Sequence, residues 1–362
     1  MTVSINHLRD LDAWTFNTLI DARSPSEYAE DHLPGAINLP VLSDAERARV
    51  GTVYKQIDPF QARKIGAALV AKNVAAHLEG ALADKPGGWK PLVYCWRGGQ
   101  RSGSFATILE QIGWPVETLD GGYRSYRKLV VNAVYDATLP HRLILLDGNT
   151  GTAKTAFLLG LKDRGHQVLD LEGLAGHRGS LFGGLSQPQP SQKALDTALA
   201  LAFAHFDPSR PVLTEAESSR IGERQLPPSV WAAMGRGPRI RLTAPSDARA
   251  RFLVHAYRDL TEDIDALCAI IESMVGIHGP ERIAVWQEMA RTRDLEALAL
   301  ALITHHYDPR YAKWRLRHDD GAAQTVALDS LDSDHQERNL DRIEKAIAAL
   351  SRAEPAAPVA AG

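Results

Sequence analysis

Residues 92–104 of this chain read LVYCWRGGQRSGS. This stretch places Cys95 between a short apolar run and a loop rich in glycine and arginine. Val93 and Tyr94 predict a buried strand, and the paired glycines allow the backbone to wrap tightly. Ser102 is a candidate N-cap for a helix that we expect to begin two residues later. The pattern predicts a strand, a tight loop and a helix, with a cysteine at the strand end.

The surroundings of Cys95 favour a thiolate over a thiol. Loop amides, the N-terminus of the next helix and the charges of Arg97 and Arg101 all stabilise a negative charge, so the pKa of the thiol is expected to fall. The alternative is a buried structural cysteine, but an arginine-flanked loop after a strand favours a nucleophile. We assign Cys95, Arg97 and Arg101 as catalytic, and Gly98 and Gly99 as the anion-binding loop.

Composition bounds the architecture and the compartment. The chain has 362 residues, 44% of them hydrophobic, which is enough for two cores. The two cysteines do not suggest a disulfide framework, and no apolar stretch is long enough to cross a bilayer, so we expect a cytoplasmic protein that contacts no membrane. The formal net charge of -3 gives no overall attraction to nucleic acid, so an RNA partner would need local basic patches.

Alternating strand and helix signals predict an α/β fold in two domains. The first domain, 1–138, has strands at 18–22, 36–39, 91–94 and 116–119, and helices at 60–78, 104–112 and 123–135. The second domain, 139–352, has strands at 142–147, 167–171, 211–215 and 239–243 in a mainly parallel sheet, helices at 156–162 and 194–205, and an almost continuous helical part over 247–310 that is interrupted near 278–280. The boundary lies near Pro140, and 353–362 is expected to be a disordered tail.

A second candidate site opens the second domain. Residues 148–155, Gly-Asn-Thr-Gly-Thr-Ala-Lys-Thr, match a phosphate-binding loop except that Ala153 replaces the final glycine. A strand before and a helix after would aim backbone amides at a phosphate, with Lys154 as a point charge. The added methyl favours phosphate or diphosphate binding over ordinary ATP turnover. The assigned residues are Gly148, Asn149, Thr150, Gly151, Lys154 and Thr155, with Thr155 a candidate magnesium ligand.

Two further segments contribute candidate residues to the phosphate site. Glu215 and Glu217 end a predicted strand, where nucleotide hydrolases keep a metal-organising acid, and the two carboxylates share one face if the strand continues through both. His177 and Arg178 lie in a glycine-rich segment whose donors could hold an anion. A solvated strand end and a polar surface loop are the alternatives for these two segments.

Other conspicuous residues are expected to be structural. Cys268 fits the apolar face of a helix. The adjacent rings of His305 and His306 diverge on a helix, and no Cys/His cluster has zinc spacing, so we predict no structural metal, while magnesium at the phosphate-binding loop stays possible. Arginine clusters at 236–251 and 310–317, the latter near Tyr311 and Trp314, fit solvated faces better than an RNA contact.

Several motifs resemble a known family. Asp21-Ala22-Arg23, residues 32–38 (His-Leu-Pro-Gly-Ala-Ile-Asn) and the Cys95 loop resemble a rhodanese domain. The loop residues 94–102, Asp120-Gly121-Gly122-Tyr123, the phosphate-binding loop and residues 174–180 together resemble the tRNA 2-selenouridine synthase family over nearly the whole chain. The resemblance implies a rhodanese-like domain, a P-loop NTPase-like domain and a helical extension.

The resemblance also implies a function. The implied protein is a transferase that converts 2-thiouridine at the tRNA wobble position to 2-selenouridine through an S-geranyl intermediate, with Cys95 as selenium carrier. The co-substrates would be selenophosphate and geranyl diphosphate, and no cofactor would be tightly bound. Selenophosphate synthase would be a transient partner.

The residues leave two alternatives open. Five residues separate Cys95 from Arg101, one more than in ordinary rhodanese loops, and this wider loop is similar to that of dual-specificity phosphatases. A sulfurtransferase or phosphatase fused to a nucleotide-dependent kinase, without an RNA substrate, is one alternative. A sensing module in which Cys95 is an oxidisable switch is the other.

Overall fold

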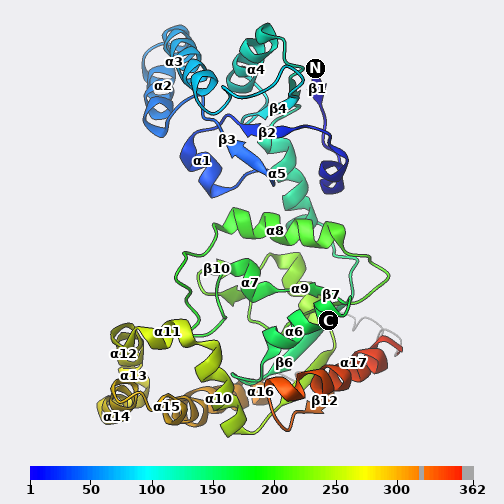
Figure 1. Ribbon diagram of the computed structural model, residues 1–362, viewed down its shortest axis with the longest axis vertical. Coiled ribbons are helices and arrows are strands. Elements are labelled where there is room, and N and C mark those ends of the chain that lie inside the picture. Colours follow the sequence, from blue (N-terminus) through cyan, green and yellow to red (C-terminus); the bar gives the residue numbers. More distant parts are fainter. Residues whose placement is uncertain (318–321, 353–362) are drawn as a thin grey trace. The chain divides into compact units, whose positions relative to one another are not determined.

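The computed structural model describes residues 1–317 and 322–352 (Figure 1). The predicted disordered tail therefore lies outside the described residues. The described chain forms two compact units, one of Met1–Thr138 with Pro190–His205 and one of Leu139–Gln189 with the chain from Phe206 onward. The single boundary predicted near Pro140 does not account for residues 190–205, which belong to the first unit.

The first unit is built on a five-stranded parallel sheet, which confirms the expected α/β fold. The strand order is β1-β5-β4-β2-β3. The strands are β1 (Thr2–Val3), β2 (Thr18–Asp21), β3 (Ala36–Asn38), β4 (Pro91–Tyr94) and β5 (Glu117–Leu119). Because β4 is central and fully buried, the loop after it starts from the middle of the sheet. Cys95 is the first residue of that loop.

Helices of the first unit bury apolar faces against this sheet. They are α1 (Pro25–Glu30), α2 (Asp44–Gln56), α3 (Pro59–Glu79), α4 (Gln100–Ile112) and α5 (Tyr123–Val131). In α4, Phe105 and Leu109 are one helical turn apart and join the core cluster that includes Ile20 and Val93 of the sheet. Helix α2 has no buried residue. Its sequence therefore lacks the regular spacing of apolar residues from which a helix can be predicted.

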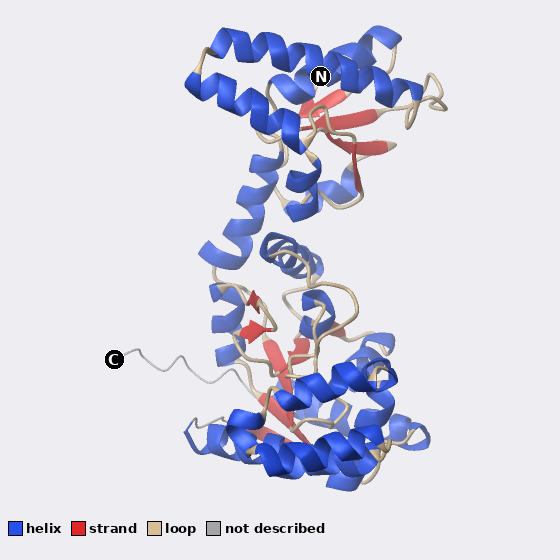
Figure 2. Cartoon of the chain, turned by 90° about the vertical axis from the view of Figure 1, so that its left-hand side faces the viewer, coloured by secondary structure: helices blue, strands red, loops and turns tan. Residues whose placement is uncertain are grey.

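The second unit contains another five-stranded parallel sheet, in the order β12-β11-β6-β8-β7, and Figure 2 shows its strands enclosed by helices. The strands are β6 (Leu143–Gly148), β7 (Gln167–Leu169), β8 (Val212–Glu215), β11 (Arg239–Thr243) and the unpredicted edge strand β12 (Ala322–Ala327). A short antiparallel pair, β9 (Arg220–Ile221) and β10 (Arg224–Gln225), lies apart from it. Helices α6 (Lys154–Asp163) and α17 (Gln336–Arg352) pack with the sheet in one core.

Shorter helices complete the second unit, and the helical extension is more broken than expected (Figure 1). Its elements are α10 (Ser246–Ala256), α11 (Arg258–Glu262), α12 (Ile264–Glu272), α13 (Val275–His278), α14 (Pro280–Arg291), α15 (Leu295–Leu302) and α16 (Asp308–Arg317), while α7 (Leu171–Ala175) and α9 (Pro228–Arg236) lie nearer the sheet. The predicted interruption is confirmed at Gly279, which has a positive φ, and Pro280. A further break occurs where the Asp263 carboxylate caps α12. None of the helices in the described ranges is long and apolar enough to cross a membrane.

Helix α8 (Gln192–His205) belongs to the first unit although it lies in sequence between β7 and β8 of the second. Buried polar contacts hold it there. Asp196 forms an ion pair with Arg127 and accepts a hydrogen bond from the Tyr135 hydroxyl at 3.2 Å. The Thr197 hydroxyl donates to the Asp31 carboxylate at 2.9 Å. Because buried charges are costly unless paired, these contacts fix which surface α8 packs on.

We predict that Asp196→Ala destabilises the first unit by about 3 kcal/mol, because the Arg127 guanidinium loses its nearest buried counter-charge and keeps only the Asp31 carboxylate at 3.9 Å. Denaturant unfolding followed by circular dichroism measures the change. Asp12→Ala is the matched control, because Asp12 pairs with His205 of the same helix but both side chains are about half exposed. The control should cost less than about 1 kcal/mol. Equal effects of the two substitutions would contradict a structural role for the buried pair.

Candidate functional site

The loop after β4 presents Cys95 beside the first turn of α4. Its side chain is only 3% exposed, and its Sγ lies 3.1 Å from the Ser102 Oγ. The predicted capping role of Ser102 is wrong, because α4 begins at Gln100 with Gly99 as N-cap residue and Ser102 is buried within the first turn. The early helix start turns the Ser102 hydroxyl toward the sulfur instead of toward a helix end.

The predicted fall in the pKa of Cys95 agrees with this geometry. Burial raises the pKa of the thiol, and the hydroxyl and backbone amide of Ser102 are the first of several groups that together lower it by more. The charge of Arg101 and the amide of Gly99 add to the lowering, so the net shift favours the thiolate.

The N-terminus of α5 holds the Cys95 loop in place. The backbone N–H of Tyr123 donates to the Cys95 carbonyl at 2.8 Å, and that of Arg124 donates to the Trp96 carbonyl at 3.0 Å. Gly122 has a φ of +61°, and a Cβ there would overlap the Cys95 carbonyl oxygen. The Gly-Gly-Tyr motif is therefore part of the cysteine site, because only glycine lets the two backbones approach so closely.

The two arginines of the loop lie in different environments. Arg101 forms an ion pair with Glu27 of α1 at 2.7 Å, and Glu27 also contacts Arg47 at 3.1 Å. Arg97 is exposed and makes no hydrogen bond or ion pair within residues 1–317 and 322–352. The structure therefore leaves Arg97 available to an incoming anion, whereas Arg101 acts on the sulfur from a fixed position.

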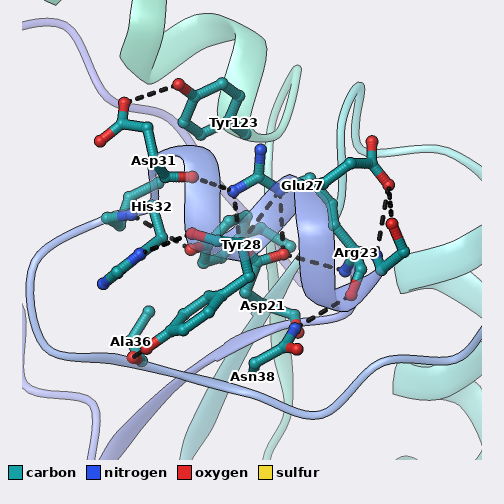
Figure 3. A network of polar contacts seen from close by, with 12 residues as sticks. Asp21, Arg23, Glu27, Tyr28, Asp31, His32, Ala36, Asn38 and Tyr123 are labelled. Atoms are coloured by element: carbon teal, nitrogen blue, oxygen red, sulfur yellow. Dashed lines mark hydrogen bonds and ion pairs between the residues drawn. The ribbon is translucent and has the colours of Figure 1, made fainter. Parts of the chain in front are cut away.

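A buried polar network connects the strand end of β2 with α5 (Figure 3). Arg23 donates to the Asp21 carboxylate and to the Asp31 carbonyl, each at 2.6 Å, and its guanidinium lies 3.9 Å from the centre of the Tyr123 ring. The Tyr123 hydroxyl donates to the Asp31 carboxylate at 2.6 Å. Burial raises the pKa of Asp31 although these hydrogen bonds oppose the rise. The network fixes Tyr123, whose amide supports the Cys95 carbonyl.

The predicted phosphate-binding loop lies between β6 and α6, as expected from its strand and helix signals. The Nε and Nη2 atoms of Arg249 donate to the Thr150 carbonyl at 2.9 and 2.8 Å. Arg249 is also paired with Asp308 at 2.8 Å, and Asp308 accepts from the Asn149 amide at 2.8 Å. Gly151 has a φ of +85°. The loop is thus held from α10 and α16, elements about a hundred residues or more away in sequence.

The methyl group of Ala153 does not lie where the sequence suggested. Ala153 adopts the left-handed conformation, with a φ of 59°, and its side chain is buried in the core cluster with Phe157 and Leu158. The substitution of glycine therefore costs backbone strain instead of blocking the approach of a ligand.

Lys154 lies among acidic side chains. Its Nζ donates to the Gly148 carbonyl at 3.1 Å. Burial lowers the pKa of Lys154, but the negative charges of Tyr311, Glu217, Glu172 and Asp147 together raise it by more, so the lysine keeps its charge. The Thr155 hydroxyl donates to Glu172 at 2.9 Å. This cluster combines one cation with two carboxyl groups at the start of α6.

The carboxyl groups of Glu172 and Glu217 interact directly. Burial raises the pKa of Glu217, the positive charge of Lys154 lowers it, and the hydrogen bond with Glu172 raises it again, to about 7. Glu217 can therefore exchange a proton near neutral pH. With Thr155, these two carboxylates are the residues that could hold a magnesium ion, but the described residues contain no group of three or more His, Cys, Asp or Glu side chains arranged for a metal.

Glu215 and Glu217 do not share one face, because β8 ends at Glu215 and the next residue leaves the strand. Glu215 is fully buried and accepts a hydrogen bond from the Leu171 amide at 3.0 Å. Burial, reinforced by Asp170, raises its pKa well above the usual value. Glu215 therefore positions α7, and of the two predicted carboxylates only Glu217 lies near Lys154.

The segment containing His177 and Arg178 lies beside these carboxylates. The His177 Nδ1 accepts from the Gly179 amide at 3.1 Å, and a Cβ on Gly179 would contact the Glu217 carboxylate. Arg178 pairs with Asp259 at 2.9 Å and stacks on the Tyr257 ring. Its Nη1 is buried and has no hydrogen-bond partner among the described residues. The segment thus brings an unsatisfied cationic donor to the site.

Sequence reasoning missed Glu172, Arg249 and Asp308 as parts of this site. Glu172 could have been found, since it directly follows the predicted strand that pairs with β8. Arg249 and Asp308 lie in helices whose polar residues we expected to face solvent. The prediction of Cys268 as a core residue is confirmed, because it packs with Ile271 and Trp286.

Comparison with known proteins covers both parts of the chain. The Rhodanese-like domain family matches residues 5–129, and the family described as tRNA 2-selenouridine synthase AAA domain matches residues 141–273. The chain is 32% identical over 339 residues to the tRNA 2-selenouridine synthase of Chromohalobacter salexigens, an alignment that covers 85% of this chain and 91% of that protein.

Two other relatives carry the same name. The chain is 36% identical over 245 residues to the protein of Shewanella halifaxensis and 38% identical over 217 residues to that of Nitrosomonas europaea. These alignments cover 66% and 59% of this chain, and they span 65% and 56% of the length of the two relatives.

We predict that Ser102→Ala raises the pKa of the Cys95 thiol, because the thiolate loses its hydroxyl donor. Alkylation of Cys95 by iodoacetamide at neutral pH should slow by about tenfold, since a hydrogen bond to a charged group is worth roughly 1.5–3 kcal/mol. Rates measured across pH, with the modified residue identified by mass spectrometry, give the pKa. Ser104→Ala, an exposed serine in the same helix, should leave the profile unchanged. An unchanged profile for Ser102→Ala would show that the hydroxyl does not stabilise the thiolate.

Proposed function

This chain belongs to the tRNA 2-selenouridine synthase family, and from that premise we propose that it replaces sulfur by selenium in a tRNA nucleoside. The observation that carries the proposal is the pairing of a thiolate-favouring loop at Cys95 with a phosphate-binding loop at Lys154 in one chain. The substrate would be 2-thiouridine at the wobble position. The first reaction attaches a geranyl group to the nucleoside sulfur, and the second replaces the thiogeranyl group with selenium.

Geranylation fits the chemistry around Lys154. The nucleoside sulfur attacks C1 of geranyl diphosphate, the carbon–oxygen bond breaks, and diphosphate leaves with the electron pair. The charges of Lys154 and Arg178 would offset the negative charge that develops on the leaving diphosphate. The alkylated nucleoside also loses the proton of its ring nitrogen N3. Glu217, with a pKa of about 7, is a carboxylate that could accept this proton near neutral pH.

Selenium delivery fits the chemistry around Cys95. We propose that the thiolate takes selenium from selenophosphate and holds it as a selenosulfide, while Arg97 and the loop amides bind the phosphate. Selenium in selenophosphate is at the oxidation level of selenide. Forming the sulfur–selenium bond, with phosphate as the other product, therefore removes two electrons from the sulfur and selenium atoms, and a disulfide-type acceptor would take them. When selenide is released, a thiol would return two electrons to the selenosulfide.

The spacing of the loop favours a second route that needs no oxidant. The five residues between Cys95 and Arg101 suit a tetrahedral phosphoryl group, as in the phosphatase loops that this loop resembles. In this route the thiolate attacks phosphorus, the phosphorus–selenium bond breaks, and selenide leaves with the electron pair. Water then hydrolyses the sulfur–phosphorus bond to give phosphate. In either route selenide adds to C2 of the geranylated nucleoside and expels geranyl thiol.

We predict that Cys95→Ser abolishes formation of 2-selenouridine while geranylation stays within about twofold, because only the selenium step uses the thiolate. Nucleosides from digested tRNA, analysed by mass spectrometry after incubation with both co-substrates, measure the two products. Cys268→Ala is the control for loss of a cysteine and should retain both activities. Selenouridine formed by the Cys95→Ser protein would exclude Cys95 from the reaction.

The adduct trapped on Cys95 separates the two routes. Acid quenching after exposure to selenophosphate should leave radiolabelled selenium on the protein if Cys95 carries selenium, and radiolabelled phosphate if it takes the phosphoryl group. If the wild-type protein forms no 2-selenouridine from thiolated tRNA, the alternative of a sulfurtransferase or phosphatase without an RNA substrate replaces the proposal.

We predict that Lys154→Ala slows geranylation by about 100-fold, the usual loss when one group that stabilises developing charge is removed. Selenation of tRNA that has already been geranylated should be retained, since Cys95 performs that step. Lys162→Ala, which removes an exposed lysine from the same helix, is the matched control and should have no effect on either rate. A geranylation rate unchanged by Lys154→Ala would exclude the phosphate-binding loop from this reaction.

A further inference from the structure

An apolar cavity lies within the helical extension of the second unit. It encloses about 530 Å³ of non-atom space, a figure that includes space open to solvent, and about 70 Å³ of it is open to the centre of a water molecule. Its walls come from α10, α11, α12 and α15 and from the phosphate-binding loop. The apolar part of the lining includes Phe182, Leu253, Leu267, Leu295, Leu298 and Leu302. Such a lining offers little to a nucleotide base or a sugar, because buried polar groups need hydrogen-bond partners.

The cavity adjoins the phosphate-binding loop directly. Thr150 of that loop is one of the lining residues. Leu253, another lining residue, lies against Gly151, since its Cγ would be 3.0 Å from a Cβ built on that glycine. A ligand whose phosphate lies on the loop therefore has an apolar space next to it, without an intervening wall of polar side chains.

Polar groups gather at one edge of the same cavity. Tyr257, a lining residue, has its hydroxyl 3.3 Å from the Ser180 Oγ, and the Arg178 guanidinium lies 4.7 Å from the centre of its ring. The Nη1 of Arg178 is buried and lacks a hydrogen-bond partner in the described part of the chain. Although Asp259 pairs with Nη2 of this guanidinium, a buried donor atom that lacks an acceptor is costly, so this edge is suited to a negatively charged group that accepts from Nη1.

These observations specify an amphiphilic ligand with an anionic head and a hydrocarbon chain. We propose that the cavity binds the isoprenoid chain of a prenyl diphosphate, while the diphosphate lies on the phosphate-binding loop between Lys154 and Arg178. The inference rests on the proposed geranyl transfer and adds the place of the hydrocarbon. The second unit alone would then bind geranyl diphosphate, and the walls of the cavity would set the length of chain that is accepted.

Filling the cavity tests the proposal. Leu295→Trp places a larger side chain in the wall, and Val254→Phe does so from α10, so one variant remains if the other fails to fold. Both should raise the KM for geranyl diphosphate by at least about tenfold, the loss expected when about two methylene groups no longer fit. Inhibition by inorganic diphosphate should stay within about twofold, because it does not use the cavity. Leu300→Trp, on the outer face of the same helix as Leu295, is the control and should behave as wild type.

The length of the prenyl chain gives a second readout. The five-carbon dimethylallyl diphosphate should lose less than geranyl diphosphate in the filled variants, since its chain ends nearer the phosphate loop. Folded variants with an unchanged KM for geranyl diphosphate would overturn the proposal.

Direct binding keeps a failure of the cavity distinct from a failure of the proposed function. If the wild-type protein geranylates no tRNA, the proposed function fails, and calorimetry decides the cavity by itself. Geranyl diphosphate should bind wild type at least about tenfold more tightly than inorganic diphosphate, and the filled variants should lose this difference. Equal binding of the two ligands to wild type would show that the cavity takes no hydrocarbon.

Discussion

The first site depends on a backbone contact that only glycine permits. At Gly122 the N-terminus of α5 lies so close to the loop after β4 that a side chain would overlap the Cys95 carbonyl oxygen. The amide of Tyr123 satisfies that carbonyl, so the loop keeps one curvature and directs the amides of Gly99 and Ser102 to the sulfur. The reactivity of the thiolate thus depends on two chain segments, the loop after β4 and the N-terminus of α5. The buried network of Arg23 and Asp31 holds the N-terminus of α5 through Tyr123.

The phosphate-binding loop is built on the same principle with different chemistry. Here a charged side chain, Arg249, grips the Thr150 carbonyl from outside the loop, and Asp308 neutralises the arginine. Both loops follow a buried parallel strand, where function is commonly located in such sheets. In each case a distant part of the chain fixes the loop backbone. Glu215 and Glu217 have different roles, since one positions α7 and the other lies near Lys154.

The strands could be predicted from sequence where apolar runs are short and bounded by turn residues. The bounds of β4 and β11 follow directly from such runs, whereas α2 and β12 lack an apolar face strong enough to show a period. The role of Ser102 could not be predicted from sequence. Helix α4 begins four residues before the expected start, and its N-cap residue, Gly99, has no capping side chain. Glu172 and Arg249 were missed because their importance arises only when the fold brings them to Lys154 and Thr150.

Helix α8 shows why the division between the units could not be read from its sequence. Its apolar period predicts a helix but does not say which surface covers it, and the answer lies in Asp196 and Thr197, two polar residues that look incidental in an apolar helix. Their partners Arg127 and Asp31 precede residue 138, so a fragment that ends at a simple domain boundary removes from this guanidinium and this carboxyl the contacts that α8 supplies. Since Asp31 also holds Tyr123, the cysteine loop depends on a helix encoded between two strands of the other unit.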